Sequence, residues 1–492
     1  MKFKYLLSFL FVILFQFSIQ AQTVSGKVLS STNEEIPFAT IQIGSDYGVI
    51  SNEEGGFSID TDGFSATDIV IISCLGFENL TMDVKSFSSN DYILKERMEE
   101  LSEVFISNKK LTVEEILQNV QTNIASNYNV NNQSEIFFRT TAFITSKKVE
   151  FKILKATELP KSKIKAINSE FENLRKGSEN KTSSNYNDLL LNYSKFNDTS
   201  KINIIKATKL INESKDKSAD KLQKDLEALI MKQLDTNATY KVKSGIFKVD
   251  DSLKVVNNSN TKSTDSIKTQ YIKQSLSNIL KKNTIEEENS YFSFIFNLNK
   301  NNYKLEGITY LNENSIYKIS FTPKRKSEIF KGIIYVNTDD FAIVKIDYEL
   351  GEGRLGYSIN VKALLGFKMS ENKINGSVFY KKDDSGFYNI QYIKSEKEIY
   401  MYMSRPFKLI KNKENEDDDK NVLKFDFTTE NIITTKKEIY FTKNSLNTET
   451  TFNQFENSET YFIEKIKAYD PEIWKNHNVI APVKAIENYH LE

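Results

Sequence analysis

The chain has 492 residues, of which 39% are hydrophobic and 27% are charged. Its 66 Lys and Arg residues balance its 66 Asp and Glu residues, so the formal net charge is zero. This length is enough for two or three domains with hydrophobic cores. A nucleic-acid-binding protein normally carries a basic excess, so the balanced charge argues against that class.

The N-terminus has the pattern of a secretory signal peptide, predicted at residues 1–21. Lys2 and Lys4 precede an uncharged apolar run at 5–19, and Ala21 precedes the expected cleavage point. Cleavage there would give an exported mature chain. An uncleaved membrane anchor is the alternative, but the run is short for a bilayer span. No later segment is long and apolar enough to predict a transmembrane helix.

Residues 22–97 have the pattern of short strands joined by turns. Apolar residues recur in the runs 24–28, 38–43 and 68–74, and two glycines lie in the turn at 52–56. Short strands at close spacing predict a β-sandwich. Cys74 is the single cysteine, so no disulfide can form within the chain, and its apolar setting predicts a buried structural thiol.

The same region carries a family resemblance. The runs V-S-G-K-V, I-P-F-A-T-I, S-N-E-E-G-G-F-S-I and I-I-S-C-L-G-F-E occur in this order between residues 24 and 78. Together with 92–94 and 100–106 they resemble the carboxypeptidase regulatory-like domain, which often follows a signal peptide in the Bacteroidota. The resemblance implies a transthyretin-like, seven-stranded sandwich without catalytic residues of its own.

Residues 98–134 are expected to be a linker that contains a capped helix. Thr112 and Glu115 have the spacing of a capping box, and the apolar residues that follow share one helical face. This pattern predicts a helix over 112–126.

Residues 135–290 are expected to be mixed, with a large helical insertion. After a β-like stretch at 135–155, apolar residues at helical spacing predict three or four helices within 161–234, and another helix is expected at 268–281. Residues 250–267 have few apolar residues and are expected to form a mobile loop. The apolar residues at helical spacing are Ile164, Ile167, Phe171, Leu174, Leu222, Leu226, Leu229, Ile230 and Leu234.

Residues 291–465 alternate between apolar and polar side chains, and 466–492 form a C-terminal segment. Turns at 337–340 and 383–386 separate alternating runs, which predicts hairpins of an antiparallel sheet. The predicted fold class is mainly β with a helical insertion, an N-terminal transthyretin-like β-sandwich being followed by a larger C-terminal antiparallel β-sheet domain. The order of parts, with F-F-R-T-T at 137–141 and Y-D-P-E-I-W-K-N-H-N-V-I at 469–480, resembles a flavobacterial family of unknown function.

We predict no catalytic, cofactor-binding or metal-binding residues. The run 351–356 matches G-x-G-x-x-G, but a strand-like segment follows it where a dinucleotide site needs a helix N-terminus. His477 and His490 are the two histidines, so no zinc carboxypeptidase motif can be built, and a Ser-His-Asp triad would depend on His477.

Two weaker patterns remain. The acidic run 414–419 could bind calcium, but it lacks the spacing of an EF-hand, and a solvated hairpin tip is the preferred interpretation. Asp251-Ser252-Leu253 and Asp265-Ser266-Ile267 resemble a three-residue O-glycosylation signal of the Bacteroidota, although chance matches to so short a motif are common.

The sequence therefore predicts a non-enzymatic structural or binding protein of the cell envelope, in the periplasm or at the outer membrane or cell surface. An envelope protein, a glycan or a lipid could be its partner. A carboxylate-based glycan hydrolase is one alternative, since 66 acidic residues allow some pair to converge. A lipid or lipoprotein carrier that uses the C-terminal sheet is another. An outer-membrane transport receptor is the least favoured, because the remaining strands are few and charged.

Overall fold

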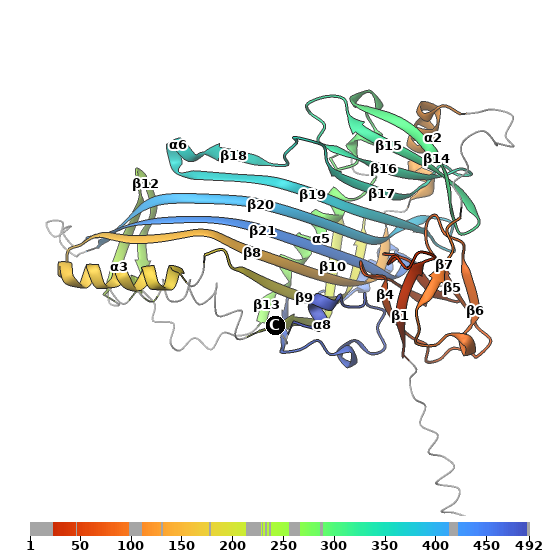
Figure 1. The fold of residues 1–492 in the computed structure, drawn as a ribbon, viewed down its shortest axis with the longest axis horizontal. Coiled ribbons are helices and arrows are strands. Elements are labelled where there is room, and N and C mark those ends of the chain that lie inside the picture. Colours follow the sequence, from red (N-terminus) through yellow and green to blue (C-terminus); the bar gives the residue numbers. More distant parts are fainter. Residues whose placement is uncertain are drawn as a thin grey trace, which may run out of the picture. The chain divides into compact units, whose positions relative to one another are not determined.

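The computed structural model (Figure 1) describes most of residues 23–489, in two compact units. The sandwich unit comprises residues 1–97 and 470–483, and the large-sheet unit comprises 98–469 and 484–492. The predicted signal peptide, the acidic run 414–419 and His490 lie outside the described residues. The described ranges are 23–97, 111–212, 228–254, 266–412 and 422–489, except 46, 129–130, 177–178, 229, 232–233, 236–237 and 286–288.

The sandwich unit packs a three-stranded sheet against a four-stranded sheet, which confirms the predicted β-sandwich. In the first sheet, β1 (Thr23–Ser30) pairs antiparallel with β4 (Gly56–Asp60) and parallel with β7 (Tyr92–Leu94). The second sheet has the order β3 (Tyr47–Ile50), β2 (Thr40–Ile43), β5 (Ile69–Ser73) and β6 (Leu80–Asp83), with the 3₁₀ turn η1 (Val84–Ser86) after it. Cys74 directly follows β5 and is half-buried against the core.

Residues 470–483, including the 3₁₀ turn η5 (Pro471–Trp474), belong to the sandwich unit although they are almost 400 residues away from it in sequence. Asn52 holds them. Its Nδ2 donates to the carbonyl oxygens of Pro482 (2.7 Å) and Ala481 (3.3 Å). Its Oδ1 accepts from the amides of Glu54 (2.9 Å) and Gly56 (2.8 Å), so one buried side chain also fixes the turn before β4.

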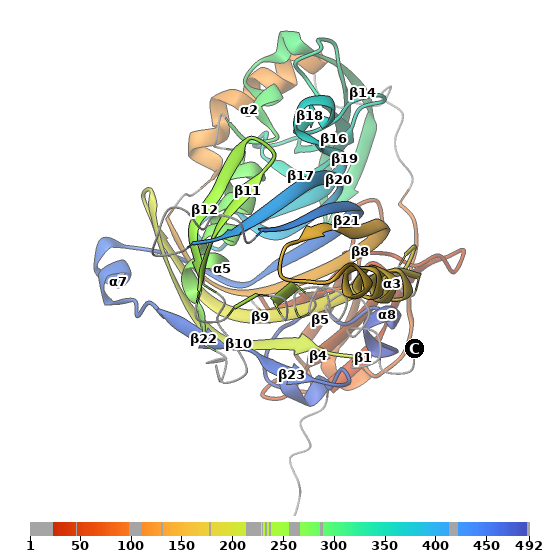
Figure 2. The ribbon, with the colours of Figure 1, turned by 90° about the vertical axis from the view of Figure 1, so that its left-hand side faces the viewer.

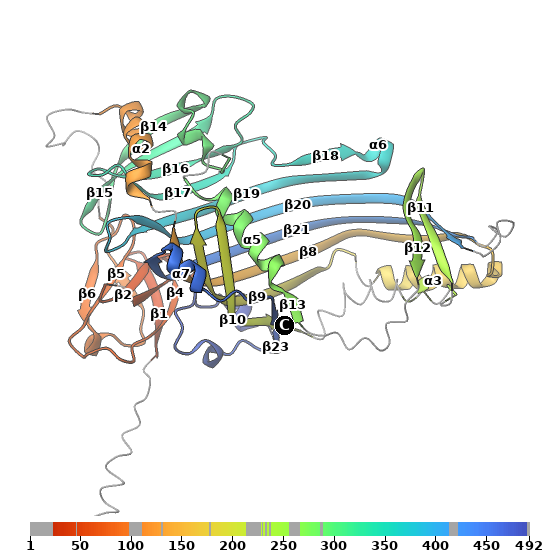
Figure 3. The ribbon, with the colours of Figure 1, turned by 180° about the vertical axis from the view of Figure 1, so that it is seen from behind.

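The large-sheet unit is built on one 14-stranded sheet, antiparallel except where β10 (Thr199–Leu210) meets β23 (Glu464–Ile466) (Figures 1 and 3). Three adjacent strands have 24 or 25 residues each, several times the usual length: β20 (Tyr388–Lys411), β21 (Val422–Leu446) and β8 (Asn132–Ala156). Across the sheet the order is β14 (Asn301–Leu311), β15 (Asn314–Pro323), β16 (Phe330–Asn337), β17 (Ile343–Leu350), β19 (Phe367–Lys382), β20 (Tyr388–Lys411), β21 (Val422–Leu446), β8 (Asn132–Ala156), β9 (Thr182–Phe196), β10 (Thr199–Leu210) and β23 (Glu464–Ile466).

Smaller strands extend this sheet at its margins. β11 (Thr239–Ser244) pairs with the end of β20 and with β12 (Phe247–Lys254), and β18 (Ser358–Val361) pairs with β19. A separate ribbon joins β13 (Ser266–Lys268) to β22 (Thr460–Phe462). The expected mobile loop at 250–267 is therefore partly strand, and its central residues 255–265 lie outside the described residues.

The helices agree with the sequence patterns in three places. α2 (Val113–Asn127) has the predicted capping box between Thr112 and Glu115. α3 (Lys161–Lys176) and α5 (Thr269–Lys282) occupy segments where helices were predicted. The shorter helices are α6 (Lys362–Leu365), α7 (Glu449–Gln454) and α8 (Lys484–Glu487), with 3₁₀ turns η2 (Ser293–Ile295) and η3 (Leu298–Lys300).

The predicted helical insertion within 161–234 is wrong for residues 182–210. They form the hairpin β9–β10, which pairs with β8 and extends the sheet as far as β23. Leu189, Leu190 and Leu191 are all buried, because both faces of the sheet are covered at this point. A strand buried on both faces loses its period-two alternation, and its sequence is then hard to distinguish from a helix.

Candidate functional site

The face of the large sheet that carries α5 is called the inner face, and Figure 2 shows the sheet curving around this helix. Lys437 of β21 marks this face, because its Nζ donates to Ser275 Oγ of α5 at 2.9 Å. Side chains alternate between faces along a strand. The odd-numbered residues of β21 from Leu423 to Phe441 and of β20 from Ile393 to Leu409 therefore share the inner face.

Both ends of the inner face are filled with packed side chains. At one end, α3 covers β8 and β21, where Phe171 lies 5.4 Å from the ring of Phe151 and is fully buried. Near α5, the rings of Phe292 and Tyr348 lie 5.5 Å apart, and the Tyr348 hydroxyl donates to Asn283 Oδ1. These contacts form two ordinary hydrophobic cores on the same face.

Between the two cores lies a strip of apolar side chains that are only half-buried, and we call it the apolar floor. The register places Ile399 of β20 beside Ile433 of β21, and Ile433 beside Ile144 of β8. Met401 pairs with Met369 of β19 in the next row. The apolar floor consists of Ile144, Met369, Ile399, Met401, Met403 and Ile433.

Two lysines lie at the α5 end of the apolar floor, and we call them the lysine pair. Lys397 lies opposite Thr435, one position along the inner face from Lys437. In the described part of the chain, Lys437 makes its bond to Ser275 and has no carboxylate within ion-pair distance. Burial lowers the pKa of Lys437, and repulsion from Lys397 lowers it further.

Unlike Lys437, Lys397 has, among the described residues, a carboxylate that neutralises its charge. Its Nζ donates to Glu371 Oε1 at 3.1 Å and lies 5.8 Å from the centre of the Tyr291 ring. Burial on its own would lower the pKa of Lys397, but Tyr291 and the Glu371 carboxylate raise it overall. The lysine pair therefore holds one neutralised cation and one desolvated cation with no counter-charge among the described residues.

This arrangement is chemically suited to an anion that is joined to an apolar group. A desolvated ammonium gains interaction energy when a carboxylate or phosphate approaches it. Along β20, the six residue steps from Lys397 to Met403 span about 20 Å at roughly 3.3 Å per residue, and Ile399, Met401 and Met403 of the apolar floor lie along them. The apolar floor thus offers a contact surface of that length beside the charge, and covering it would remove apolar area from water.

A cavity of about 290 Å³ lies on the inner face, between α5, the β9–β10 turn and the β19–β20 hairpin. Aromatic rings and polar groups alternate around it, and Asp198 is its one carboxylate. Burial raises the pKa of Tyr193 in its wall to about 12, so this phenol stays neutral at physiological pH. Its principal lining residues are Tyr193, Lys195, Asp198, Lys281, Tyr388 and Asn389.

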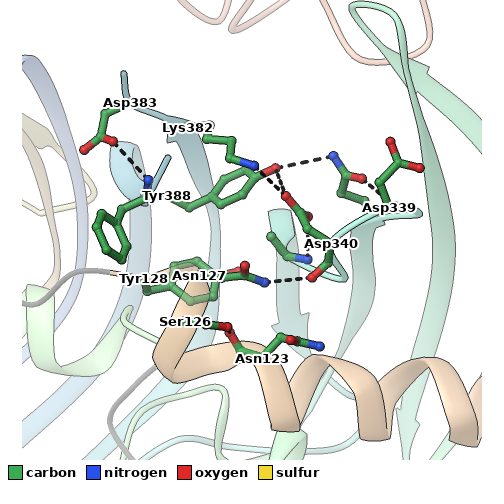
Figure 4. Close-up of polar contacts among 12 residues, drawn as sticks. Asn123, Ser126, Asn127, Tyr128, Asp339, Asp340, Lys382, Asp383 and Tyr388 are labelled. Carbon is green, nitrogen blue, oxygen red and sulfur yellow. Dashed lines mark hydrogen bonds and ion pairs between the residues drawn. The ribbon is translucent and has the colours of Figure 1, made fainter. Parts of the chain in front are cut away.

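The wall behind the cavity is fixed by a polar network that ties α2 to two turns of the sheet (Figure 4). The Tyr388 hydroxyl donates to Asp340 Oδ2 at 3.0 Å, and Lys382 Nζ contacts the same oxygen at 2.9 Å. Asn127, at the end of α2, donates to the Asp340 carbonyl at 2.9 Å. Burial and the Asp340 carboxylate raise the pKa of Tyr388. Each charge in this network already has its partner, so its role is to hold the wall rigid.

A buried ion pair lies on the opposite face of β8 and β9. Arg139 Nε and Nη2 donate to the two carboxylate oxygens of Asp188, both at 2.8 Å. Burial alone would lower the pKa of Arg139, but Asp188 and the nearby Glu438 raise it overall. The Tyr392 hydroxyl donates to Glu438 Oε1, so this charge cluster is satisfied internally.

Among the described residues that the sequence singled out, the loop 351–356 lies against the inner-face site, because the Gly356 amide donates to the Glu371 carbonyl at 3.0 Å. Residues 351–356 form a loop followed by the strand β18, as the rejection of the dinucleotide motif required. His477 lies in the C-terminal segment of the sandwich unit, where its amide donates to the Trp474 carbonyl. Ser252 and Leu253 lie on β12, Ser266 and Ile267 on β13, and Asp265 is outside the described residues.

Metal-binding groups and membrane-spanning helices are both absent from the described residues. No three His, Cys, Asp or Glu side chains among them are grouped closely enough to bind a metal ion. None of the helices in the described ranges is long and apolar enough to span a bilayer.

Comparisons with known proteins identify part of the chain. A family model for the CarboxypepD_reg-like domain matches residues 24–106. This segment is a carboxypeptidase regulatory-like domain. The resemblance stated from the sequence is thereby confirmed, and the fold of the sandwich unit agrees with it. A second family model, for a family of unknown function (DUF5686), matches residues 209–406, from the end of β10 to the long strand β20.

The remaining comparisons add little. No curated protein matches the chain. A DUF1329 family protein from Desulfovibrio piger is similar over 67% of this chain and 92% of its own, with 11% identity and a TM-score of 0.20, too low to indicate a shared fold. Neither family match is to a catalytic family, and the domain content suggests a non-catalytic binding or structural module.

Proposed function

We propose that the protein is a non-enzymatic binding protein of the cell envelope that carries an anionic amphiphile on the inner face of its large sheet. The observation that carries this proposal is the lysine pair at the end of the apolar floor. The anionic group would contact Lys437 and Ser275, and the apolar chain would cover Ile399, Met401 and Ile433. The signal-peptide pattern at residues 1–21 supports export.

The composition of the site argues for a lipid rather than a protein partner. The inner face is bounded by α3 at one end and α5 at the other, so the half-buried apolar strip is confined along the strands and lies within a curved sheet. A confined apolar strip with one charged end matches an alkyl chain with a headgroup. Protein interfaces bury larger areas, about 800 Å² on each partner.

A titration with a fluorescent long-chain fatty acid tests the proposal, with the methyl ester of the same acid as the uncharged counterpart. We expect the purified mature chain to bind the acid more tightly than the ester. Lys437→Gln should weaken binding of the acid about tenfold and leave the ester nearly unchanged. Lys424→Gln makes the same charge change at an exposed position on the opposite face of β21 and should alter neither affinity.

The apolar contact has an equally close control within one strand. Ile432 and Ile433 are consecutive and both half-buried, but they point to opposite faces of β21. Ile433→Asp should weaken both the acid and the ester, whereas Ile432→Asp should leave both affinities unchanged. Absence of binding to either probe, or equal losses in the two variants, would disprove the carrier proposal.

The cavity beside α5 favours a glycan as a second candidate ligand. Tyrosine rings offer stacking faces, and Asp198, Asn389 and Lys195 offer hydrogen bonds to hydroxyl groups. Calorimetric titration with envelope oligosaccharides tests it, and Asp198→Asn should reduce their binding without affecting the fatty acid. A hydrolase that acts on such a glycan would need two opposed carboxylates, and the lining residues supply one.

A further inference from the structure

The large-sheet unit has an end at which four apolar side chains are exposed on two neighbouring turns. Ile246 and Phe247 lie at the turn of the β11–β12 hairpin and are 93% and 45% exposed. Val249, on β12, is 60% exposed, and Leu364, on α6, is 83% exposed. Isolated surface leucines are common in soluble proteins, but several on adjacent turns form a patch.

Arg405 of β20 fastens these two turns to each other. Its Nη1 donates to the Leu365 carbonyl of α6 at 2.7 Å, and its Nη2 donates to the Ser244 carbonyl of the hairpin at 2.7 Å. Its guanidinium also lies 5.3 Å from the centre of the Phe247 ring. Turns about 120 residues apart in sequence are thereby held side by side, at the same end of the long strands (Figures 1 and 3).

The backbone of α6 is also fixed against the sheet. Gly366 ends this helix with a φ of +62°, a conformation that glycine adopts without strain. A Cβ at this position would lie 1.9 Å from the Ser404 carbonyl oxygen, so only glycine allows α6 to approach β20 this closely. Leu364 is therefore presented to solvent by a rigid turn.

The charge around the exposed side chains is positive. The hairpin at 239–254 has four lysines against Asp250 and Asp251, and one of these lysines, Lys248, pairs with Asp251. The segment 358–368 has Lys362 and Lys368 and no acidic residue. Lys362 Nζ lies 3.9 Å from the centre of the Tyr402 ring, which holds it close to the patch.

We infer that this end docks on an anionic membrane surface, with Ile246 and Leu364 inserted at the headgroup boundary and the lysines beside them contacting lipid headgroups. Apolar side chains ringed by lysines are the combination that binds such interfaces. A protein partner would also bury the apolar side chains, but the excess of lysine favours an anionic lipid surface. This inference does not depend on the carrier proposal, because it rests on different residues.

Co-sedimentation of the full mature chain with phosphatidylcholine vesicles, with and without phosphatidylglycerol, tests the inference. We expect binding to the phosphatidylglycerol vesicles at least tenfold stronger than to pure phosphatidylcholine, and weakened by salt. The double variant Ile246→Asp and Leu364→Asp should lose at least tenfold in binding. The control Leu446→Asp, at a 60% exposed position at the other end of β21, should retain it.

A positive signal is available from tryptophan fluorescence, since the chain has a single tryptophan, Trp474, which is buried. Leu364→Trp should shift its emission to the blue on anionic vesicles, and Leu446→Trp should not. Fatty-acid binding by the Ile246→Asp and Leu364→Asp variant should be unchanged, which separates this test from that of the carrier. Failure to bind anionic vesicles, equal losses in variant and control, or capture of a protein without vesicle binding would overturn the inference.

Discussion

The sandwich unit and the large-sheet unit use the same kind of residue in different ways. In the sandwich, inward side chains of β1, β2 and β5 are closed off from water, as Val28, Ile41 and Ile72 show at 0% exposure. In the large sheet, the ends of the inner face are equally well packed, but Met401 and Ile433 between them are only half-buried. The two units therefore differ in whether an apolar strip stays accessible to solvent, and the carrier proposal rests on this difference.

The largest expected effect is a loss of stability in the closely packed core of the sandwich. Phe57 is 2% exposed and lies 6.0 Å from both Phe87 and Tyr92. Phe57→Ala should lower the stability of the sandwich by about 3–5 kcal/mol, because a cavity replaces the ring. Denaturant unfolding monitored by hydrogen exchange of the sandwich amides measures it. A loss below about 1 kcal/mol would mean that this core is not closely packed around Phe57.

A smaller loss is expected where the C-terminal segment joins the sandwich. Asn52→Ala removes four hydrogen bonds from one buried side chain, and we expect a loss of about 2–3 kcal/mol, together with faster exchange of the Glu54 and Gly56 amides. Ser58→Ala, which removes one exposed hydrogen bond to Ser25, should cost less than about 0.5 kcal/mol. Equal losses in the two variants would show that Asn52 does not hold residues 481–482.

The difference between the packed and the half-buried parts of the inner face can be tested within a single strand. Ile393 and Met401 lie on the same face of β20, but Ile393 is fully buried and Met401 is half-buried. Ile393→Ala should cost about 2–5 kcal/mol, and Met401→Ala less than about 1 kcal/mol. Met401→Ala should instead weaken fatty-acid binding. Similar stability losses at both positions would show that the apolar floor is an ordinary core.

The elements that the sequence predicted share a strong local signal. The capping box at Thr112 predicted α2, because its two residues act within one turn. The antiparallel hairpins were predicted by apolar alternation and by their turn residues. The hairpin β9–β10 was missed for two reasons. Leu189, Leu190 and Leu191 are buried on both faces, and a bulge after Ile204 shifts the alternation of β10 out of phase.

The inner-face site could not be predicted, because it depends on register between strands far apart in sequence. Lys397 and Lys437 are 40 residues apart and become neighbours only when β20 and β21 pair over their full length. One signal was present. The run Tyr400-Met401-Tyr402-Met403 alternates two kinds of side chain, which indicates a strand with two different faces. The attachment of residues 470–483 to the sandwich left no comparable pattern.

The smallest expected effect is a pH dependence, and it separates the lysine pair from a merely apolar site. Because the pKa of Lys437 is lowered in the folded chain, the unfolded chain binds more protons in the range between the two pKa values, and stability should rise slightly with pH there.

The affinity for a fatty acid should show the opposite pH trend to the stability. The carboxylate favours the charged ammonium, so affinity should fall as pH rises through the lowered pKa of Lys437, below the usual lysine value of about 10.4. Lys397 keeps its charge over this range, because Tyr291 and Glu371 raise its pKa, so the fall should level off rather than abolish binding. The methyl ester should show no such dependence, and Lys437→Gln should make the profile of the acid flat, whereas Lys424→Gln should retain it. An identical profile for acid and ester would mean that the ligand does not place its charge on Lys437.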